Sequence, residues 1–280
     1  MIDATILQTA VRKNVTDALA EDIGSGDLSA ALIPQGQQAH AQVITRTPGV
    51  FCGQPWVDEA ARQVDTKIQL EWLVADGSVV AANDVLFRLS GPAAALLTAE
   101  RTLLNFVQFL SGTATKTAKY VALIQGTNTA LLDTRKTIPG LRIAQKYAVT
   151  CGGGQNHRMG LFDAYLLKEN HIAAAGSIAA AVSAARQHQP DKPVEVETEN
   201  LQELQQAIDA GAEIAMIDNF SLSETQHAVA LAKGKIKLEA SGGINENSIT
   251  EIAACGVDYI SIGEITKNID PLDSSMRFTT

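Results

Sequence analysis

Polar and charged side chains follow six short apolar runs between residues 130 and 263, at a spacing that could bring them together in one ligand-binding or catalytic site. The runs read ALLDT, AYLLK, VEVET, IAMID, IKLEAS and YISIG, and helical segments separate several of them. This alternation predicts parallel strands joined by helices. Ligands of such folds lie at the carboxyl ends of the strands, so we expect a functional rim there. The strand ends carry Asp133 to Lys136, Lys168 to His171, Glu195, Glu197, Asp218, Asn219, Glu239, Ser241 to Gly243, Gly263 and Glu264.

Four cations come from separate parts of this rim: Arg135, Lys136, Arg158 and Lys168. Residues 133 to 171 hold six Lys or Arg against three acids, a charge of +3 in a chain of net charge −9. Converging cations repel unless an anion lies between them; Arg suits planar carboxylates and Lys supplies a point charge. The cluster predicts a small ligand with carboxylates and phosphates. The acidic chain as a whole argues against nucleic acid or an anionic membrane as a partner.

Two of the strand ends contain glycine, in ASGGI and SIGEI. Glycines at successive strand ends let main-chain N–H groups approach a phosphate, and the last strands of such barrels usually hold one. Glu197 and Asp218, on consecutive strand ends, suggest Mg²⁺, which prefers a few carboxylates together with substrate phosphates. A rim ion pair with Lys or Arg is the alternative for these two acids. His157 and His171 lack transition-metal spacing, and we expect His157 to hydrogen-bond an anion.

The elements that position this rim divide the chain into two domains. Residues 1–98 contain β-rich runs broken by turns, which indicate an α/β sandwich that residues 270–280 rejoin. Residues 99–269 contain a connecting helix and the repeated β–α units, which indicate an incomplete (β/α) barrel resembling a TIM barrel. A doubly wound open sheet is the alternative.

The N-terminus lacks the apolar core of a signal peptide, and the small-residue stretch 172–185 is too short to span a bilayer. Cys52, Cys151 and Cys255 show no CxxC spacing, so we expect buried thiols in a reducing compartment. We therefore expect a cytoplasmic protein without a membrane partner.

The stretch LLDTRKTIPGLRIAQKYAVTCGGGQNHRMGLFDAYLLKENHI resembles the core signature of the quinolinate phosphoribosyltransferase family. The similarity continues through VEVETENLQEL, MIDNF, LEASGGINENSI and GVDYISIG, and includes EDIGSGDLS, PGVFCG and ERTLLNFVQFLSGTAT upstream. It therefore covers almost the whole chain. It implies an N-terminal α/β sandwich with an incomplete barrel. It also implies transfer of a phosphoribosyl group from phosphoribosyl pyrophosphate to quinolinate with loss of carbon dioxide, giving nicotinate mononucleotide for NAD biosynthesis.

The resemblance also implies roles for individual residues. Arg135, Arg158 and Lys168 would hold the quinolinate carboxylates, with His157 near them. Phosphoribosyl pyrophosphate would contact Lys136, and Glu197 and Asp218 would serve its Mg²⁺, pyrophosphate and ribose. A homodimer with shared active sites is implied as well, in which Arg101 reaches the partner's site. The remaining expected contacts, mostly to the 5′-phosphate, are Thr134, Ser241, Gly242, Gly243, Ile262, Gly263 and Glu264.

Two departures from the family pattern affect these expectations. Ile138 replaces an expected Thr, and Glu264 begins a segment where the family often has Ala-Leu-Thr-His-Ser. An acid beside a phosphate loop puts the role of the Glu264 side chain in doubt. The alternatives are a class I aldolase using Lys168 as Schiff base, the relatives associated with molybdenum transport, and a phosphate-ligand binding protein. The KENH segment argues against those relatives, and the acid pair is unexplained in a binding protein.

Overall fold

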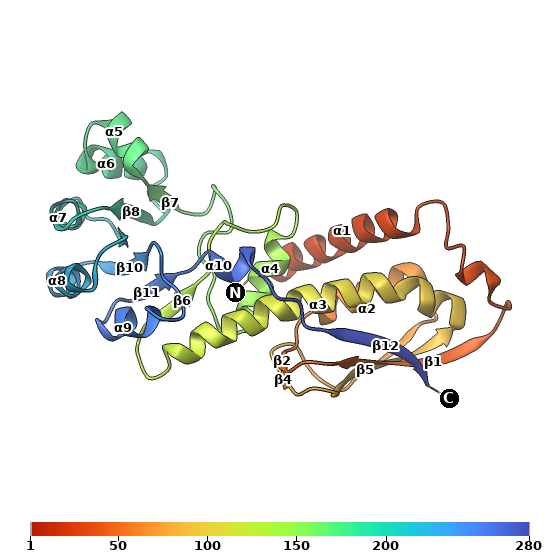
Figure 1. The fold of residues 1–280 in the computed structure, drawn as a ribbon. Helices are drawn as coiled ribbons and strands as arrows, with labels where there is room; N and C mark the ends of the chain where they lie inside the picture. The colour runs from red at the N-terminus through yellow and green to blue at the C-terminus, as the bar shows by residue number, and fades with distance from the viewer. Residues whose placement is uncertain (1, 280) are drawn as a thin grey trace. The chain divides into compact units, whose positions relative to one another are not determined.

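The computed structural model describes residues 2–279, which form two compact units (Figure 1). The first unit comprises residues 1–118, 137–153 and 264–280, and the second comprises 119–136 and 154–263. Helix α3 (Ala93–Leu123) begins in the first unit and ends in the second. No helix within the described residues is both long and apolar enough to cross a membrane.

The first unit contains a four-stranded antiparallel sheet in the order β12-β1-β5-β3. Val43 and Ala41 of β1 alternate with more exposed residues, so one face of the sheet packs on the core. That core includes Trp56 and Phe87. The elements are α1 (Ala4–Ile23), η1 (Ala30–Leu32), β1 (Gln38–Thr45), β2 (Gly49–Val50), α2 (Gln54–Val64), β3 (Gln69–Trp72), β4 (Val79–Val80), β5 (Val85–Pro92), α4 (Arg142–Cys151), α10 (Glu264–Lys267) and β12 (Ser274–Thr279).

The domain boundaries lie elsewhere than expected. Most of α3 groups with the first unit, because Leu103, Val107 and Leu110 lie in the same apolar core as Trp56. Residues 137–153 join it as well, since α4 contributes to that core. The C-terminal strand β12 returns to pair with β1, as the sequence suggested.

The second unit is a six-stranded parallel sheet in the order β6-β11-β10-β9-β8-β7. From β7 to β11 each strand lies beside the next one in sequence, so the sheet winds in one direction as a barrel does. No pairing joins β6 to β7 among the described strands, which leaves the barrel incomplete as expected and rules out the doubly wound alternative. The elements are β6 (Ala130–Leu132), β7 (Tyr165–Leu167), α5 (Glu169–Ala175), α6 (Ile178–His188), β8 (Val194–Thr198), α7 (Leu201–Asp209), β9 (Ile214–Asp218), α8 (Leu222–Ala232), β10 (Lys237–Ser241), α9 (Ile249–Ala254) and β11 (Tyr259–Ser261).

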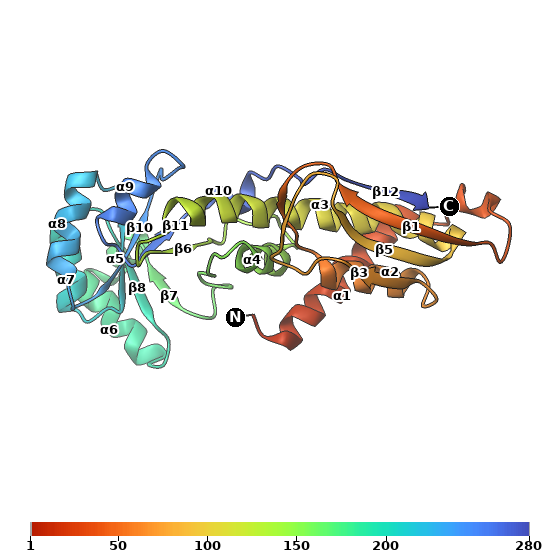
Figure 2. The same ribbon diagram turned by 90° about the horizontal axis from the view of Figure 1, so that it is seen from below.

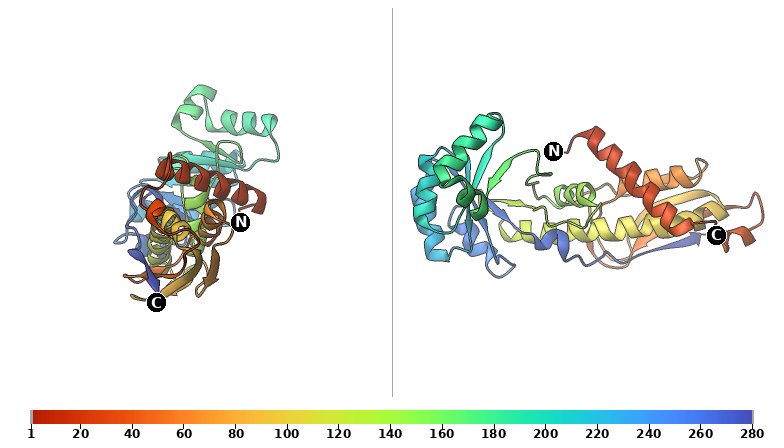
Figure 3. Two further views of the ribbon diagram at one scale, coloured as in Figure 1. Left: turned by 90° about the vertical axis from the view of Figure 1, so that its right-hand side faces the viewer. Right: turned by 90° about the horizontal axis from the view of Figure 1, so that it is seen from above.

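Because successive residues of a strand point to opposite faces, this sheet has apolar side chains on one face and polar or charged side chains on the other. Helices α6 to α9 cover one face (Figures 2 and 3). Val196 and Ile217 are buried, and residues beside them in sequence turn to the opposite face. There the register pairs Glu197 with Met216 and Met216 with Glu239. One row of the barrel interior therefore contains two carboxylates.

Candidate active site

A cavity of about 450 Å³ lies within the second unit, over the carboxyl ends of the strands. Glu239 and Ser261 line it beside most of the expected site residues. The structure thus brings together predicted residues that are up to 107 positions apart in sequence, from Thr134 to Ser241. The expected residues in its wall are Thr134, Arg135, Lys136, His157, Arg158, Lys168, Glu197, Asp218 and Ser241.

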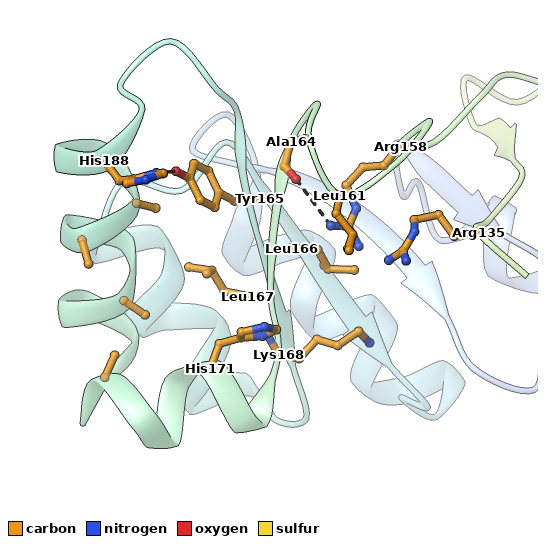
Figure 4. Close-up of a pocket in the computed structure, with 14 residues that line it drawn as sticks. Arg135, Arg158, Leu161, Ala164, Tyr165, Leu166, Leu167, Lys168, His171 and His188 are labelled. Carbon is orange, nitrogen blue, oxygen red and sulfur yellow. Dashed lines mark hydrogen bonds between the residues drawn. The ribbon is translucent and has the colours of Figure 1, made fainter.

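The cationic wall is formed by Arg135, Arg158 and Lys168. These residues also line an adjoining pocket of about 490 Å³, where they point to the same side of β7 (Figure 4). The Nε atoms of both arginines are buried without a hydrogen-bond partner. Burial, and after it the charge of Arg135, lowers the pKa of Arg158. Half-buried guanidinium groups with an unused buried donor favour an anion, so this wall is suited to a ligand with carboxylates.

The segment before Arg158 is held against β6. Leu132 forms a parallel bridge with Gln155. The carboxylate of Asp133, which is fully buried, accepts the side-chain amide of Asn156 at 2.7 Å and the main-chain N–H of His157 at 2.9 Å. Asp133 therefore fixes this segment rather than facing the cavity.

His157 lies above two buried acids, Glu195 and Glu239, which the sequence analysis placed on the rim but to which it gave no role. Its Nε2 is 2.9 Å from Glu195 Oε2 and 3.2 Å from Glu239 Oε2. Burial, and after it the charge of Glu239, raises the pKa of Glu195 to about 7. Burial alone would lower the pKa of His157, but hydrogen bonds from its Nε2 to the two acids outweigh this effect and raise the pKa. The signal in the sequence was VEVET, where acids alternate with buried valines.

The acid pair expected to bind Mg²⁺ faces the cavity. Lys168 Nζ forms an ion pair with Glu197 Oε2, and the side chain of Asn219 donates to Asp218 Oδ2 at 2.7 Å. The other carboxylate oxygen of each acid accepts no hydrogen bond from the part of the chain described. Both the metal expectation and the alternative of a rim ion pair therefore have support, since one carboxylate can pair with Lys168 and still offer an oxygen.

Two other groups of side chains have the ligand types of a metal site. The described residues bring together the ligand atoms of Cys52, Asp76 and Cys151 in the first unit, and those of His157 with its two acids in the second, each set within 4.8 Å. Cys52 is buried as expected, but Cys151 and Cys255 are partly exposed. All three cysteines are free.

The glycine-containing strand ends have the geometry of close approach. Gly242 has φ +91°, and a Cβ there would lie 2.7 Å from the main-chain N of Asn219. Gly243 has φ +61° and open space around it. A Cβ on Gly263 would lie 2.8 Å from Cδ of Lys136, so this glycine makes room for the lysine stem.

Six expected site residues are not among those that line the cavity: the three glycines just described, and Ile262, Glu264 and Arg101. The Ile262 side chain is buried, and its N–H donates to Leu132 O, so it offers no donor to a phosphate. Glu264 begins α10 and forms an ion pair with Lys116 at 2.7 Å, which gives this acid a structural partner within the first unit. Arg101 lies on α3 in the first unit and is exposed.

The comparisons with known proteins agree across the chain. Residues 27–111 match the family described as quinolinate phosphoribosyl transferase, N-terminal domain, and residues 113–277 match its C-terminal domain. A probable nicotinate-nucleotide pyrophosphorylase (carboxylating) of Bacillus subtilis is 42% identical, over 96% of this chain and 93% of its own. The Mycobacterium leprae protein of that name is 39% identical, with 94% and 95% covered. The solved structure of the nicotinate-nucleotide pyrophosphorylase from Francisella tularensis has a TM-score of 0.95 and 53% identity, and 97% of each chain is covered.

Proposed function

The chain belongs to the quinolinate phosphoribosyltransferase family, and from that membership we propose how its own residues divide the work. The protein transfers the phosphoribosyl group of phosphoribosyl pyrophosphate to quinolinate, with decarboxylation to nicotinate mononucleotide, a step of NAD biosynthesis. Pyrophosphate and carbon dioxide are the other products. The assignment of roles rests on one observation: two half-buried guanidinium groups at the rim each keep a buried Nε donor without a hydrogen-bond partner.

Quinolinate binds to the cationic wall. Arg135 and Arg158 hold its two carboxylates, and Lys168 adds a third cation. The positions of these groups orient the pyridine nitrogen toward the sugar, and orientation of this kind supplies a large part of a bimolecular rate enhancement. The bonds to the carboxylates also explain why a dianion is required: a monoanion would leave a partly buried cation without a partner.

Phosphoribosyl pyrophosphate binds over the later strands. Its 5′-phosphate is held by Ser241, Gly242, Gly243 and Gly263, where positive φ angles and missing Cβ atoms let the main chain approach. The Thr134 hydroxyl accepts a hydrogen bond from the main-chain N–H of Lys136 at 3.0 Å, which fixes the main chain of Lys136. The side chain of this lysine contacts the pyrophosphate. Lys136 thus stabilises negative charge on the leaving group.

Glu197 and Asp218 fit Mg²⁺, because each faces the cavity and keeps a carboxylate oxygen without a hydrogen bond among the described residues. Two carboxylates plus substrate phosphates are the donors that this ion prefers. When bound, the ion would supply positive charge beside the leaving pyrophosphate. Glu197 also places negative charge near the sugar, where positive charge grows as the pyrophosphate leaves.

Decarboxylation needs less from the protein. Once the nitrogen is joined to the sugar it is quaternary, and the carbanion formed by loss of the adjacent C2 carboxylate lies next to its positive charge. A proton taken up from solvent then replaces the carboxylate at C2. The residues of the cationic wall hold the ring, and no described side chain is required as a general base. The competing aldolase interpretation loses support, because Lys168 Nζ is engaged by the Glu197 carboxylate and is not free to attack a carbonyl.

We place the enzyme in the cytoplasm as a homodimer with shared active sites. Free thiols at all three cysteines support a reducing compartment. Arg101 supports the dimer, since it is an exposed cation on α3, apart from the cavity wall of the second unit. The partner's Arg101 would add a cation to this wall.

The function is tested by two readouts: formation of nicotinate mononucleotide from phosphoribosyl pyrophosphate, which can be compared between substrates, and carbon dioxide release from quinolinate labelled at its 2-carboxylate. Nicotinate is the matched control substrate, because it lacks only the 2-carboxylate. We expect product from quinolinate and a kcat/KM for nicotinate lower by about a thousandfold, which corresponds to about 4 kcal/mol. Comparable turnover of both compounds would show that the wall does not select a dianion.

A further inference from the structure

The His157 ring contacts two buried carboxylates, and the proposed reaction uses neither of them. Their side chains are 5% (Glu195) and 0% (Glu239) exposed, and they come from β8 and β10, the strands on either side of β9. Oε1 of Glu195 and both carboxylate oxygens of Glu239 have no well-aligned hydrogen-bond partner. Burying two adjacent carboxylates costs free energy, and apolar side chains of similar size would pack there without that cost. A functional reason for the pair is therefore needed.

The imidazole connects this acid pair to the substrate rim. Nε2 points down to the acids, and Nδ1 accepts the main-chain N–H of Arg158 at 2.7 Å. The N–H of His157 itself donates to Asp133. The main-chain N–H groups of His157 and Arg158 are thus both fixed by hydrogen bonds. The guanidinium of Arg158 lines the cavity, so these bonds also fix the main chain that carries it.

The position of the ring proton decides whether this connection holds. The two acids hold a proton on Nε2, the nitrogen that faces them, whereas a proton on Nδ1 would face the N–H of Arg158 and break that hydrogen bond. The geometry therefore requires the proton on Nε2 and a lone pair on Nδ1. Carboxylates below Nε2 enforce that tautomer, as carboxylate partners do for many functional histidines.

We propose that Glu195 and Glu239 are positioning residues for quinolinate binding, which act on Arg158 through the tautomer and orientation of the His157 ring. The inference rests on the proposed role of Arg158 in holding a quinolinate carboxylate. It assigns His157 to the support of Arg158 rather than to the substrate itself. Loss of either acid releases the ring, and with it the main chain at Arg158, while the phosphoribosyl pyrophosphate side of the cavity stays unchanged.

The tautomer is measured in the wild-type protein. Long-range ¹H–¹⁵N spectra of histidine-labelled enzyme, with His157→Asn to assign the ring, should show a protonated Nε2 and an unprotonated Nδ1 at neutral pH. A ring protonated at Nδ1 overturns the proposal, and this readout does not depend on a variant that folds.

The kinetic test compares Glu195→Gln and Glu239→Gln with Glu213→Gln. Gln keeps the shape of the acid but removes its charge and offers an N–H to Nε2. We expect KM for quinolinate to rise by about tenfold or more in the first two variants, with KM for phosphoribosyl pyrophosphate within about twofold of wild type. Glu213 is the matched control: it immediately precedes β9 of the same sheet and pairs with Arg186, outside the cavity wall. Its variant should keep both KM values.

Equal rises in both KM values, or an unchanged KM for quinolinate, contradict the positioning role. Failure of the proposed function has a different signature, because the wild-type enzyme itself would then release no carbon dioxide from quinolinate.

Discussion

Lys168 Nζ donates to Oε2 of Glu197, so a cation expected to bind quinolinate neutralises a carboxylate expected to bind the metal. The two side chains come from the ends of the neighbouring strands β7 and β8. Without substrates, the Lys168 ammonium and the Glu197 carboxylate neutralise one another. Binding of quinolinate and of phosphoribosyl pyrophosphate with its ion must therefore separate the pair or share it, which links the two halves of the cavity.

Replacement of Lys168 by Met tests this link. The change removes a cation from quinolinate and leaves Glu197 without its partner. We expect kcat/KM for quinolinate to fall about thirtyfold or more, corresponding to about 2 kcal/mol. Initial-rate kinetics of the purified variant measure the loss, and Lys233→Met, an exposed lysine after α8, is the control with unchanged rates. A Lys168→Met enzyme with wild-type kcat/KM would contradict both roles of the lysine.

A divalent cation should be required for turnover. Enzyme treated with excess chelator should lose activity and regain it on addition of MgCl₂. Glu197→Gln and Asp218→Asn should each raise the Mg²⁺ concentration for half-maximal activity about tenfold, because each removes a charged oxygen ligand. The exposed Asp209 on α7 gives the control variant Asp209→Asn. Full activity in excess chelator is incompatible with the prediction.

Arg101 should act in the partner's site. Arg101→Ala and Lys168→Ala should each be nearly inactive alone, whereas a re-paired equal mixture should recover about a quarter of wild-type activity, since about half the dimers are mixed and one of their two sites is intact. A mixture of Lys168→Ala with Glu197→Gln should show no more activity than the two parent variants measured alone, because every cavity in it carries one of the two defects. Native mass spectrometry verifies the exchange; a first mixture that exchanges but stays inactive places Arg101 elsewhere.

Gly242 should tolerate no side chain. An Ala Cβ would combine a φ of +91° with a contact of 2.7 Å to the main chain of Asn219. We expect Gly242→Ala to raise KM for phosphoribosyl pyrophosphate about tenfold or more, as the phosphate-binding main chain shifts. Gly234 has a similar φ of +71° with open space around it, so Gly234→Ala should cost only about 1 kcal/mol of stability and leave KM unchanged. Equal KM values for the two variants would show that the contact has no effect.

The stability of the protein should depend on pH through Glu195. Its pKa is raised from 4.5 to about 7 in the folded state, first by burial and then by Glu239, so the fold favours the protonated form. The contribution is fully present below about pH 4.5 and is lost as the pH rises through about 7. Relative to Glu195→Gln, the wild type should lose up to about 3 kcal/mol of unfolding free energy across this window. Urea unfolding without Mg²⁺ measures it, and parallel pH curves for the two proteins would argue against a raised pKa.

Strand ends were the most predictable feature of the sequence. Polar residues follow the apolar runs, and parallel pairing brought those residues together, as with Lys136, Lys168 and Glu197. The incomplete barrel followed from the same repeats. Side chains inside the runs were harder to interpret, because Glu195 and Glu239 interrupt apolar letters and their burial appears only when the sheet assigns alternate residues to its two faces.

Partners distant in the chain were also beyond prediction. Glu264 appeared out of place beside a phosphate loop, but it pairs with Lys116, 148 positions away. The boundary of the first unit was misplaced for the same reason: α3 and α4 contribute side chains to a core whose other members are far away in sequence, such as Trp56 and Phe87. The local sequence pattern indicates which face of a helix is apolar, but it does not indicate which other element of the fold packs against that face.

The pairing of β12 with β1 has a consequence for synthesis on the ribosome. His40 pairs with Thr279, so an outer strand of the first unit's sheet emerges only after the entire second unit has been made. During translation the edge of β1 that pairs with β12 stays unpaired until β12 has been made. The first unit therefore cannot complete its fold while the second unit is being synthesised. The second unit, whose strands β7 to β11 pair with their immediate successors, has the lower contact order and should fold ahead of it.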